Sequence, residues 1–366
     1  MSAKSNTTTA SRLKVAIVND LAVACEALRR AVVQDPAFEV MWTAKDGAQA
    51  IEMAARERPD LILMDLIMPR VNGVEATRAI MRATPCPILV VTATVSGNAA
   101  LVFEALGAGA LDAVNTPSFG EGALLKGGEE LLRRMHLVAR VARGERSAAT
   151  LAPTAVAVAA AATPTVQRTR AAAAPMATRA AEGSIIAIGA STGGPRAIAD
   201  VLLALPPKTG ASILVVQHLS TAFVEGFADW LGTETHRRVV CARAGDALRA
   251  DEVLIAAEDR HMVLSSDGVI EYRDEPRASL HRPSVDELFS SLATSSRRGV
   301  AVLLTGMGSD GAEGLLRLRR AGWHTIAQDQ KTSVVWGMPG AAHALGAAVE
   351  TLALPLIASA TQARLV

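Results

Sequence analysis

The sequence has few cysteines, and they lie far apart. Cys25, Cys86 and Cys241 form no Cys-x-x-Cys pair. This spacing argues against a disulfide framework or a zinc cage, and it favours a reducing, cytoplasmic setting. Metal-ligand spacing such as His-Glu-x-x-His is also missing around His236, His261, His281, His324 and His343.

The chain also has neither an excess of one charge sign nor a long apolar run. The chain carries 37 Lys and Arg against 36 Asp and Glu, a formal net charge of +1. This balance argues against wholesale binding to nucleic acid or to an anionic membrane. No apolar run reaches the roughly 18 residues of a membrane-spanning helix. The polar first residues have no apolar stretch like that of a secretory signal, so we expect neither export nor membrane insertion.

What the sequence does have is enough apolar material for two ordinary cores. The length of 366 residues, half of them hydrophobic, favours two domains. The residues from about 144 to 182 are mostly Ala, Thr, Pro and Arg, which cannot bury much surface. We therefore predict a first domain over residues 12–140, a linker over 141–182 and a second domain over 183–366.

Strand and helix patterns alternate along the first domain. The predicted strands are residues 13–19, 38–44, 60–65, 87–93 and 111–116, with helical patterns between them. Five strands separated by helices predict a doubly wound, flavodoxin-like parallel sheet, with ligands beyond the carboxyl ends of its strands. In the second domain, buried strands at 184–190, 212–218 and 299–306 predict a further α/β domain with a mainly parallel sheet.

Polar residues end three strands of the first domain. Asn19 and Asp20 close the first strand, Asp65 closes the third, and Thr92 lies at the end of the fourth. Oxygen ligands gathered at one sheet edge suit Mg²⁺, and an Asp beside that cation can accept a phosphoryl group. The alternative is that each Asp only caps a helix or stabilises a turn. The set as a whole favours the site.

In the second domain, one hydroxyl lies in a glycine-rich turn between a strand and a helix. Gly189-Ala190-Ser191-Thr192-Gly193 fits the G-x-S-x-G pattern of a nucleophilic serine. Such a turn can also bind phosphate on its backbone N–H groups or simply cap the helix. His218 and Asp310, each after another buried strand, supply a base and an acid. The order Ser, His, Asp differs from that of an α/β-hydrolase.

Several longer motifs resemble known families. The stretches VAIVNDLAVACEALRRAV, DLILMDLIMPRVNGVEAT and VVTAT resemble a response-regulator receiver domain. The resemblance implies that Asp65 carries the phosphoryl group, that Asn19, Asp20 and Asp65 surround Mg²⁺, and that Thr92 switches upon phosphorylation. Two departures are Asn19, where the family has an acid, and Thr116, where it has a lysine. We therefore expect that Asp65 can be phosphorylated, but that the signalling or the lifetime of the phosphorylated state is altered.

The motifs GASTGGP, QHLS, RPSVDELFSSLA, LTGMGSDGAEG and VVWGMPGAA resemble the chemotaxis protein-glutamate methylesterases of the CheB type. The resemblance implies hydrolysis of glutamate methyl esters, and deamidation of glutamines, on methyl-accepting chemoreceptors. A CheA-type histidine kinase would supply the phosphoryl group. The resemblance also implies that Ser191 is the nucleophile, His218 the base and Asp310 the orienting acid. Thr192 and backbone N–H groups near Met307 would line the site. The ester hydrolysis needs no metal.

Two other functions remain as alternatives. The second domain could bind only a partner or a nucleotide, which the paired glycines 193–194 would suit, although no Walker lysine follows them. It could also bind DNA, but the chain has no basic stripe and its charge is near neutral.

Overall fold

The computed structural model describes residues 12–93, 98–120, 125–142, 184–219, 221–277, 279 and 281–365. The predicted linker, residues 141–182, lies outside these ranges except for residues 141 and 142, which end a helix. The predicted domain boundaries therefore stay a prediction. Across the ranges that are described, no helix combines the length and the apolar character needed to cross a membrane.

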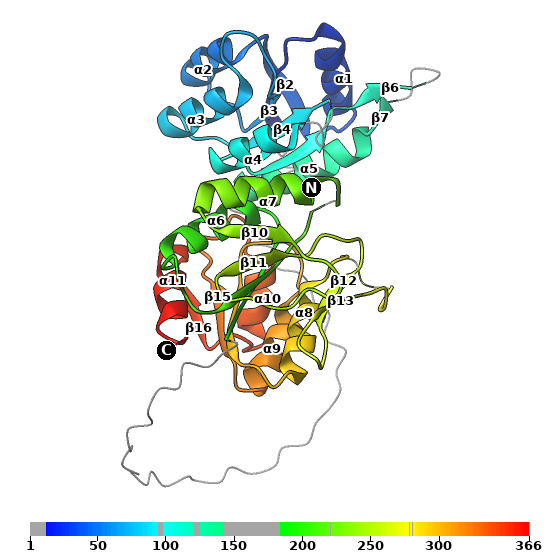
Figure 1. The fold of residues 1–366 in the computed structure, drawn as a ribbon. Helices are drawn as coiled ribbons and strands as arrows, with labels where there is room; N and C mark the ends of the chain where they lie inside the picture. The colour runs from blue at the N-terminus through cyan, green and yellow to red at the C-terminus, as the bar shows by residue number, and fades with distance from the viewer. Residues whose placement is uncertain are drawn as a thin grey trace, which may run out of the picture.

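The N-terminal half contains a five-stranded parallel sheet in the order β2-β1-β3-β4-β5 (Figure 1). Its strands are β1 (Leu13–Val18), β2 (Phe38–Ala44), β3 (Leu61–Met64), β4 (Ile88–Thr92) and β5 (Asp112–Asn115). The helices are α1 (Ala22–Val33), α2 (Gly47–Arg56), α3 (Gly73–Ala83), α4 (Ala99–Gly107) and α5 (Gly128–Ala142). A small antiparallel pair, β6 (Ser118–Phe119) and β7 (Leu125–Lys126), precedes α5. The order confirms the predicted doubly wound sheet.

Local sequence explains where these elements begin and end. All four residues of β3 are buried, as expected for a central parallel strand covered on both faces. Helix α3 begins at a capping box, in which the Asn72 side chain accepts from the Glu75 N–H and Glu75 accepts from the Asn72 N–H. Asp46 caps α2 in a similar way by accepting from the Gln49 N–H.

The C-terminal half contains a seven-stranded sheet in the order β10-β11-β9-β8-β14-β15-β16, with every neighbouring pair parallel. The strands are β8 (Ile185–Ala190), β9 (Ser212–Gln217), β10 (Arg238–Cys241), β11 (Glu252–Ile255), β14 (Gly299–Leu303), β15 (His324–Gln328) and β16 (Glu350–Leu352). An antiparallel hairpin joins β12 (His261–Leu264) to β13 (Ile270–Arg273). The helices are α6 (Gly194–Ala204), α7 (Thr221–Thr235), α8 (Val285–Thr294), α9 (Ala312–Arg320), α10 (Met338–Ala344) and α11 (Leu354–Gln362).

This half confirms the α/β class and the three predicted strands, and it adds elements that the sequence analysis left out. Helical patterns were expected after the first and third of these strands, whereas α7 also follows the second. Helix α7 begins four residues after the end of β9, so the connection is short.

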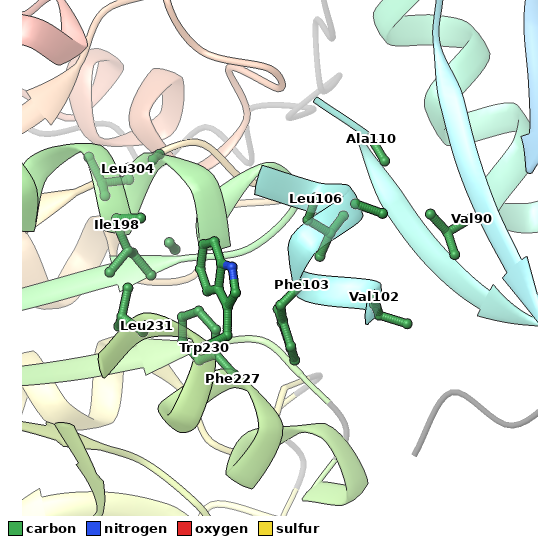
Figure 2. Packing of buried hydrophobic residues seen from close by; sticks show 14 of the residues in the cluster. Val90, Val102, Phe103, Leu106, Ala110, Ile198, Phe227, Trp230, Leu231 and Leu304 are labelled. Carbon is green, nitrogen blue, oxygen red and sulfur yellow. The ribbon is translucent and has the colours of Figure 1, made fainter. Parts of the chain in front are cut away.

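The two halves meet through helices α4 and α7, which lie against each other (Figure 1). Phe103 of α4 points at Phe227 and Trp230 of α7, with ring centroids 5.2 and 5.9 Å apart (Figure 2). A single cluster of buried apolar residues therefore runs from the first sheet to the second. Nearby, the Arg196 guanidinium of α6 donates to the Gly107 carbonyl at 3.0 Å.

Candidate active site

Three neighbouring strands of the second sheet bring Ser191, His218 and Asp310 to one edge. Ser191 directly follows β8, His218 directly follows β9, and Asp310 lies in the loop after β14. Strand β8 lies between β9 and β14, and all three strands are parallel. The carboxyl ends of parallel strands share one edge, which is where ligands bind in such sheets.

The turn that carries Ser191 depends on glycine. Gly193, just before α6, has a φ of 75°, a conformation that residues with a side chain rarely adopt. At Gly306 an added Cβ would lie 2.8 Å from the Ser191 Cβ, so only glycine lets the loop after β14 approach so closely. Helix α6 begins directly after this turn: the Gly194 N–H donates to the Ser191 carbonyl at 2.8 Å, and Pro195, which has no N–H, occupies the first turn of the helix.

His218 and Asp310 form a hydrogen-bonded pair. The His218 Nε2 lies 2.8 Å from the Asp310 Oδ2, and both side chains are largely buried. The other ring nitrogen, Nδ1, is buried and has no hydrogen-bond partner in the described part of the chain. Since a carboxylate can only accept, Nε2 carries the proton and Nδ1 is left with a free lone pair. A neutral imidazole in this tautomer can act as a base.

Asp310 accepts hydrogen bonds from several groups besides His218. The Ser284 hydroxyl donates to Oδ1 at 2.7 Å, the Asp286 N–H donates to Oδ1 at 3.0 Å, and the Val285 N–H donates to Oδ2 at 2.7 Å. Burial alone would raise the pKa of Asp310, but the His218 interaction and these donors outweigh it and hold the pKa well below its ordinary value. Asp310 is therefore ionised over the physiological pH range.

The ring of His281 stacks on the ring of His218, with centroids 4.0 Å apart and an interplanar angle of 15°. Burial, and after it the neighbouring His218, lower the pKa of His281. Ser284 belongs to the motif RPSVDELFSSLA, which carries the family resemblance, but no role was predicted from the sequence for either Ser284 or His281. The signal was the HRPSVD motif itself, which supplies the histidine stack and the donors to Asp310.

These residues open onto a cavity of about 750 Å³ at the junction of the two halves. From the second half, the cavity is lined by Ser191, Thr192, His218, His281 and Met307, among others. From the first half, Phe103 and Leu106 of α4 and Arg133 and Arg134 of α5 contribute to its wall. The structure thus brings Thr192 and Met307 to the same cavity as Ser191 and His218, and the first domain closes part of the cavity.

The polar cluster of the first domain also assembles at one sheet edge. Asn19 follows β1 and Asp65 follows the neighbouring strand β3, and the Asn19 Nδ2 donates to the Asp65 Oδ2 at 3.0 Å. Burial raises the pKa of Asp65 to about 6, and Asp20 adds to the effect. Thr92 ends the next strand, β4, and accepts from the Asn98 Nδ2 at 3.0 Å. Thr116 donates its N–H to the Thr92 carbonyl.

The donor set suits a divalent cation only in part. Asp20 and Asp65 supply two carboxylates, and a nearby cation would offset the desolvation of Asp65. The Asn19 amide is already engaged, because its Oδ1 accepts from the Leu21 N–H at 2.9 Å while its Nδ2 donates to Asp65. The described residues contain no group of three or more His, Cys, Asp or Glu side chains placed to hold a metal.

Comparison with known proteins gives consistent results for both halves. Residues 186–361 match the family model described as CheB methylesterase, and residues 15–126 match that of the response regulator receiver domain. The chain is 47% identical over 351 residues to protein-glutamate methylesterase/protein-glutamine glutaminase 1 of Burkholderia lata, covering 94% of this chain and 97% of that protein. A protein with the same description from Cupriavidus pinatubonensis is 46% identical, with coverage of 94% and 96%. The crystal structure of the Thermotoga maritima CheB methylesterase catalytic domain is 32% identical, covers 50% of this chain and 98% of that chain, and has a TM-score of 0.46.

Proposed function

Because the chain belongs to the family of CheB-type protein-glutamate methylesterase/protein-glutamine glutaminases, we propose that Ser191, His218 and Asp310 carry out its hydrolysis. The protein is a methylesterase and glutaminase with a receiver domain that acts in chemotaxis receptor adaptation. The observation that carries the assignment is the hydrogen bond of 2.8 Å between His218 and Asp310. It leaves the Nδ1 of His218 without a partner among the described residues, and His218 lines the same cavity as Ser191.

In the proposed reaction, the Ser191 Oγ attacks the γ-carbonyl carbon of a glutamate methyl ester. His218 takes the Ser191 proton at Nδ1, while its Nε2–H stays hydrogen-bonded to Asp310. The imidazolium then protonates the methoxide, which leaves as methanol. Water attacks the acyl-serine, gives its proton to His218, and releases the glutamate and the serine. With a glutamine substrate, ammonia leaves in place of methanol.

The negative charge that develops on the carbonyl oxygen needs donors already aimed at it. Backbone N–H groups near Met307 are our candidates, with Thr192 lining the site. A single such donor contributes about 10²–10³ in rate. This hydrolysis is proposed to use no metal.

Regulation is proposed to act through the contact between the two halves. Residues of α4 and α5 close part of the cavity, so a receptor segment reaches Ser191 only when the receiver domain moves away. Phosphorylation of Asp65, with Thr92 as the switch residue, would shift the equilibrium from the closed to the open arrangement. A CheA-type histidine kinase is the proposed phosphodonor and methyl-accepting chemoreceptors the substrates. The three free cysteines suit a cytoplasmic setting.

The receiver site would hold Mg²⁺ through Asp20 and Asp65, with Asn19 beside it. When bound, the cation would neutralise charge as the phosphoryl group reaches Asp65. The chain's own contribution is to fix the Asp65 carboxylate, whose Oδ1 accepts from the Leu66 N–H at 2.7 Å and whose Oδ2 accepts from Asn19.

The test measures methanol release from a methylated receptor fragment, with and without a small-molecule phosphodonor and Mg²⁺. Ser191→Ala should abolish release while the circular dichroism spectrum stays unchanged. Asp65→Asn should keep the resting rate and lose the stimulation by the phosphodonor. Retained release by folded Ser191→Ala would end the nucleophile assignment. A phosphodonor response that survives in Asp65→Asn would end the assignment of the phosphorylation site.

A further inference from the structure

Asp310 lies between glycines in the loop that follows β14. Gly308 and Gly311 flank it, with φ angles of 75° and 87°, in a loop rich in glycine. Glycine allows more backbone conformations than any other residue. Within this loop, the groups that bind the Asp310 carboxylate help to orient it toward His218.

Four donors occupy the two carboxylate oxygens, and three of them come from one short segment. That segment is Ser284 and the first two residues of α8, Val285 and Asp286. Val285 and Asp286 contribute backbone N–H groups, which any residue would supply. Ser284 contributes its side chain, so it is the member of the set whose identity matters.

Ser284 is itself held in place. Its side chain is 1% exposed, and its backbone N–H donates to the Nδ1 of His261 at 3.2 Å. Because that nitrogen accepts, the proton of His261 is on Nε2, which lies 3.3 Å from the Pro276 carbonyl oxygen. His261 is fully buried. The hydroxyl of Ser284 is therefore presented to Asp310 from a fixed backbone.

The simpler interpretation is that Ser284 only caps α8. Its hydroxyl oxygen does accept from the Glu287 N–H, but at 3.4 Å, whereas it donates to Asp310 at 2.7 Å. The shorter bond, to a charged acceptor, is the stronger one. The principal partner of the hydroxyl is Asp310 rather than the end of the helix.

We propose that Ser284 is a positioning residue for the hydrolysis: its hydroxyl fixes the Asp310 carboxylate in the orientation that aligns His218 toward Ser191. This inference rests on the roles proposed above for His218 and Asp310. A displacement of about 1 Å in a catalytic group can lower a rate about 10²-fold. Loss of the hydroxyl should therefore slow the chemical step without weakening the binding of the substrate.

The experiment uses the full chain with phosphodonor, Mg²⁺ and a methylated receptor fragment. Ser284→Ala should lower kcat by about 10- to 100-fold with little change in KM. Ser284→Thr, which restores a hydroxyl, should recover most of that loss. The matched control is Ser212→Ala, which removes another buried hydroxyl, bound to the Arg249 carbonyl, at the opposite end of β9 from His218. It should keep kcat within about twofold.

A double-mutant cycle separates this proposal from the assignment of Asp310. If Ser284 acts through Asp310, Ser284→Ala should cause no further loss in an Asp310→Ala background. Two results would overturn the role of Ser284 but leave the assignment of Asp310 intact. One is an equal loss of kcat upon Ser284→Ala in both backgrounds, and the other is a wild-type kcat for Ser284→Ala when Asp310→Ala is inactive. A wild-type kcat for Asp310→Ala would overturn the assignment of Asp310, and the role of Ser284 with it.

If Ser284→Ala does not fold, Ser284→Cys keeps the proposal open to test, because a thiol is close in size and donates only weakly. An intermediate kcat would support the proposal, and a wild-type kcat would overturn it.

Discussion

Phe103→Ala is the substitution that most directly tests how the two halves are held together. Phe103 is 1% exposed and belongs to α4 of the receiver domain, so the substitution changes no residue of the catalytic half. Its ring lies against Phe227 and Trp230 of α7 (Figure 2). Removing it takes apolar contact away from the closed arrangement, in which these rings meet.

The magnitude follows from this packing. Burying a Phe side chain contributes about 1.5–3 kcal/mol. An aromatic pair adds about 0.5–1.5 kcal/mol. The closed arrangement should therefore lose at most about 2–4.5 kcal/mol relative to the open one. Since about 1.4 kcal/mol corresponds to a tenfold change in an equilibrium constant, the ratio of open to closed molecules should rise by up to about 30- to 1,600-fold.

The assay is methanol release from a methylated receptor fragment without any phosphodonor. Phe103→Ala should raise this resting rate toward that of the phosphorylated wild type, and small-angle scattering should show a larger radius of gyration. The control is Phe38→Ala, which removes an equally buried ring from β2, where its ring neighbour is His136 of the same domain. It should destabilise the receiver domain without raising the resting rate.

Two results would refute this reasoning. Folded Phe103→Ala with the resting rate of the wild type would show that the contact between α4 and α7 does not restrain the enzyme. An equal rise in rate for Phe38→Ala would show that loss of receiver stability, rather than loss of the contact, releases the activity.

Two further predictions concern other parts of the chain. At Gly226 of α7 an added Cβ would lie 2.3 Å from the Cβ of Ala99 in α4. Gly226→Val should therefore push the two halves apart and raise the resting rate of methanol release by about tenfold or more. Gly232→Ala is the control on the same helix, because its added Cβ would lie 3.4 Å from the nearest atom, the Arg237 carbonyl oxygen, and it should leave the resting rate unchanged. Burial raises the pKa of Asp286 to about 6, so the folded state binds a proton more tightly than the unfolded chain, and this group's contribution to the free energy of unfolding falls as the pH rises from about 4 to about 6. Asp286→Asn should remove that fall in urea unfolding measured at about pH 4.5 and about pH 7, a window in which Asp310, with its lowered pKa, is already ionised.

Much of the fold could be predicted because its signals are local. The strand patterns matched the parallel strands of the first domain to within one or two residues at each end, since runs such as LILM are buried on both faces. Four strands of the second sheet, β10, β11, β15 and β16, were missed. Strands β10, β15 and β16 include partly exposed residues, and β11 is buried but has only four residues and begins with a glutamate, so the apolar pattern of each is weak.

The candidate site divides in a similar way. Ser191, His218 and Asp310 could be proposed from the sequence because each directly follows a strand or lies in a glycine-rich loop after one. Ser284 and His281 could not be placed, because their partners lie 26 and 63 positions away in the chain. Nothing in a local pattern states which residues across such a separation will meet.

Local patterns along the chain were enough to predict the α/β class, the chemical types at the strand ends, and the resemblance to a receiver joined to a methylesterase. These follow from periodicity and from short motifs, which are properties of neighbouring residues. Three contacts became visible only in the folded molecule: α4 packs against α7 beside the cavity, Asn19 donates to Asp65, and the Ser284 hydroxyl donates to Asp310. Those contacts depend on the order of strands in each sheet and on the docking of one domain on the other, because only folding brings distant residues within a few ångströms.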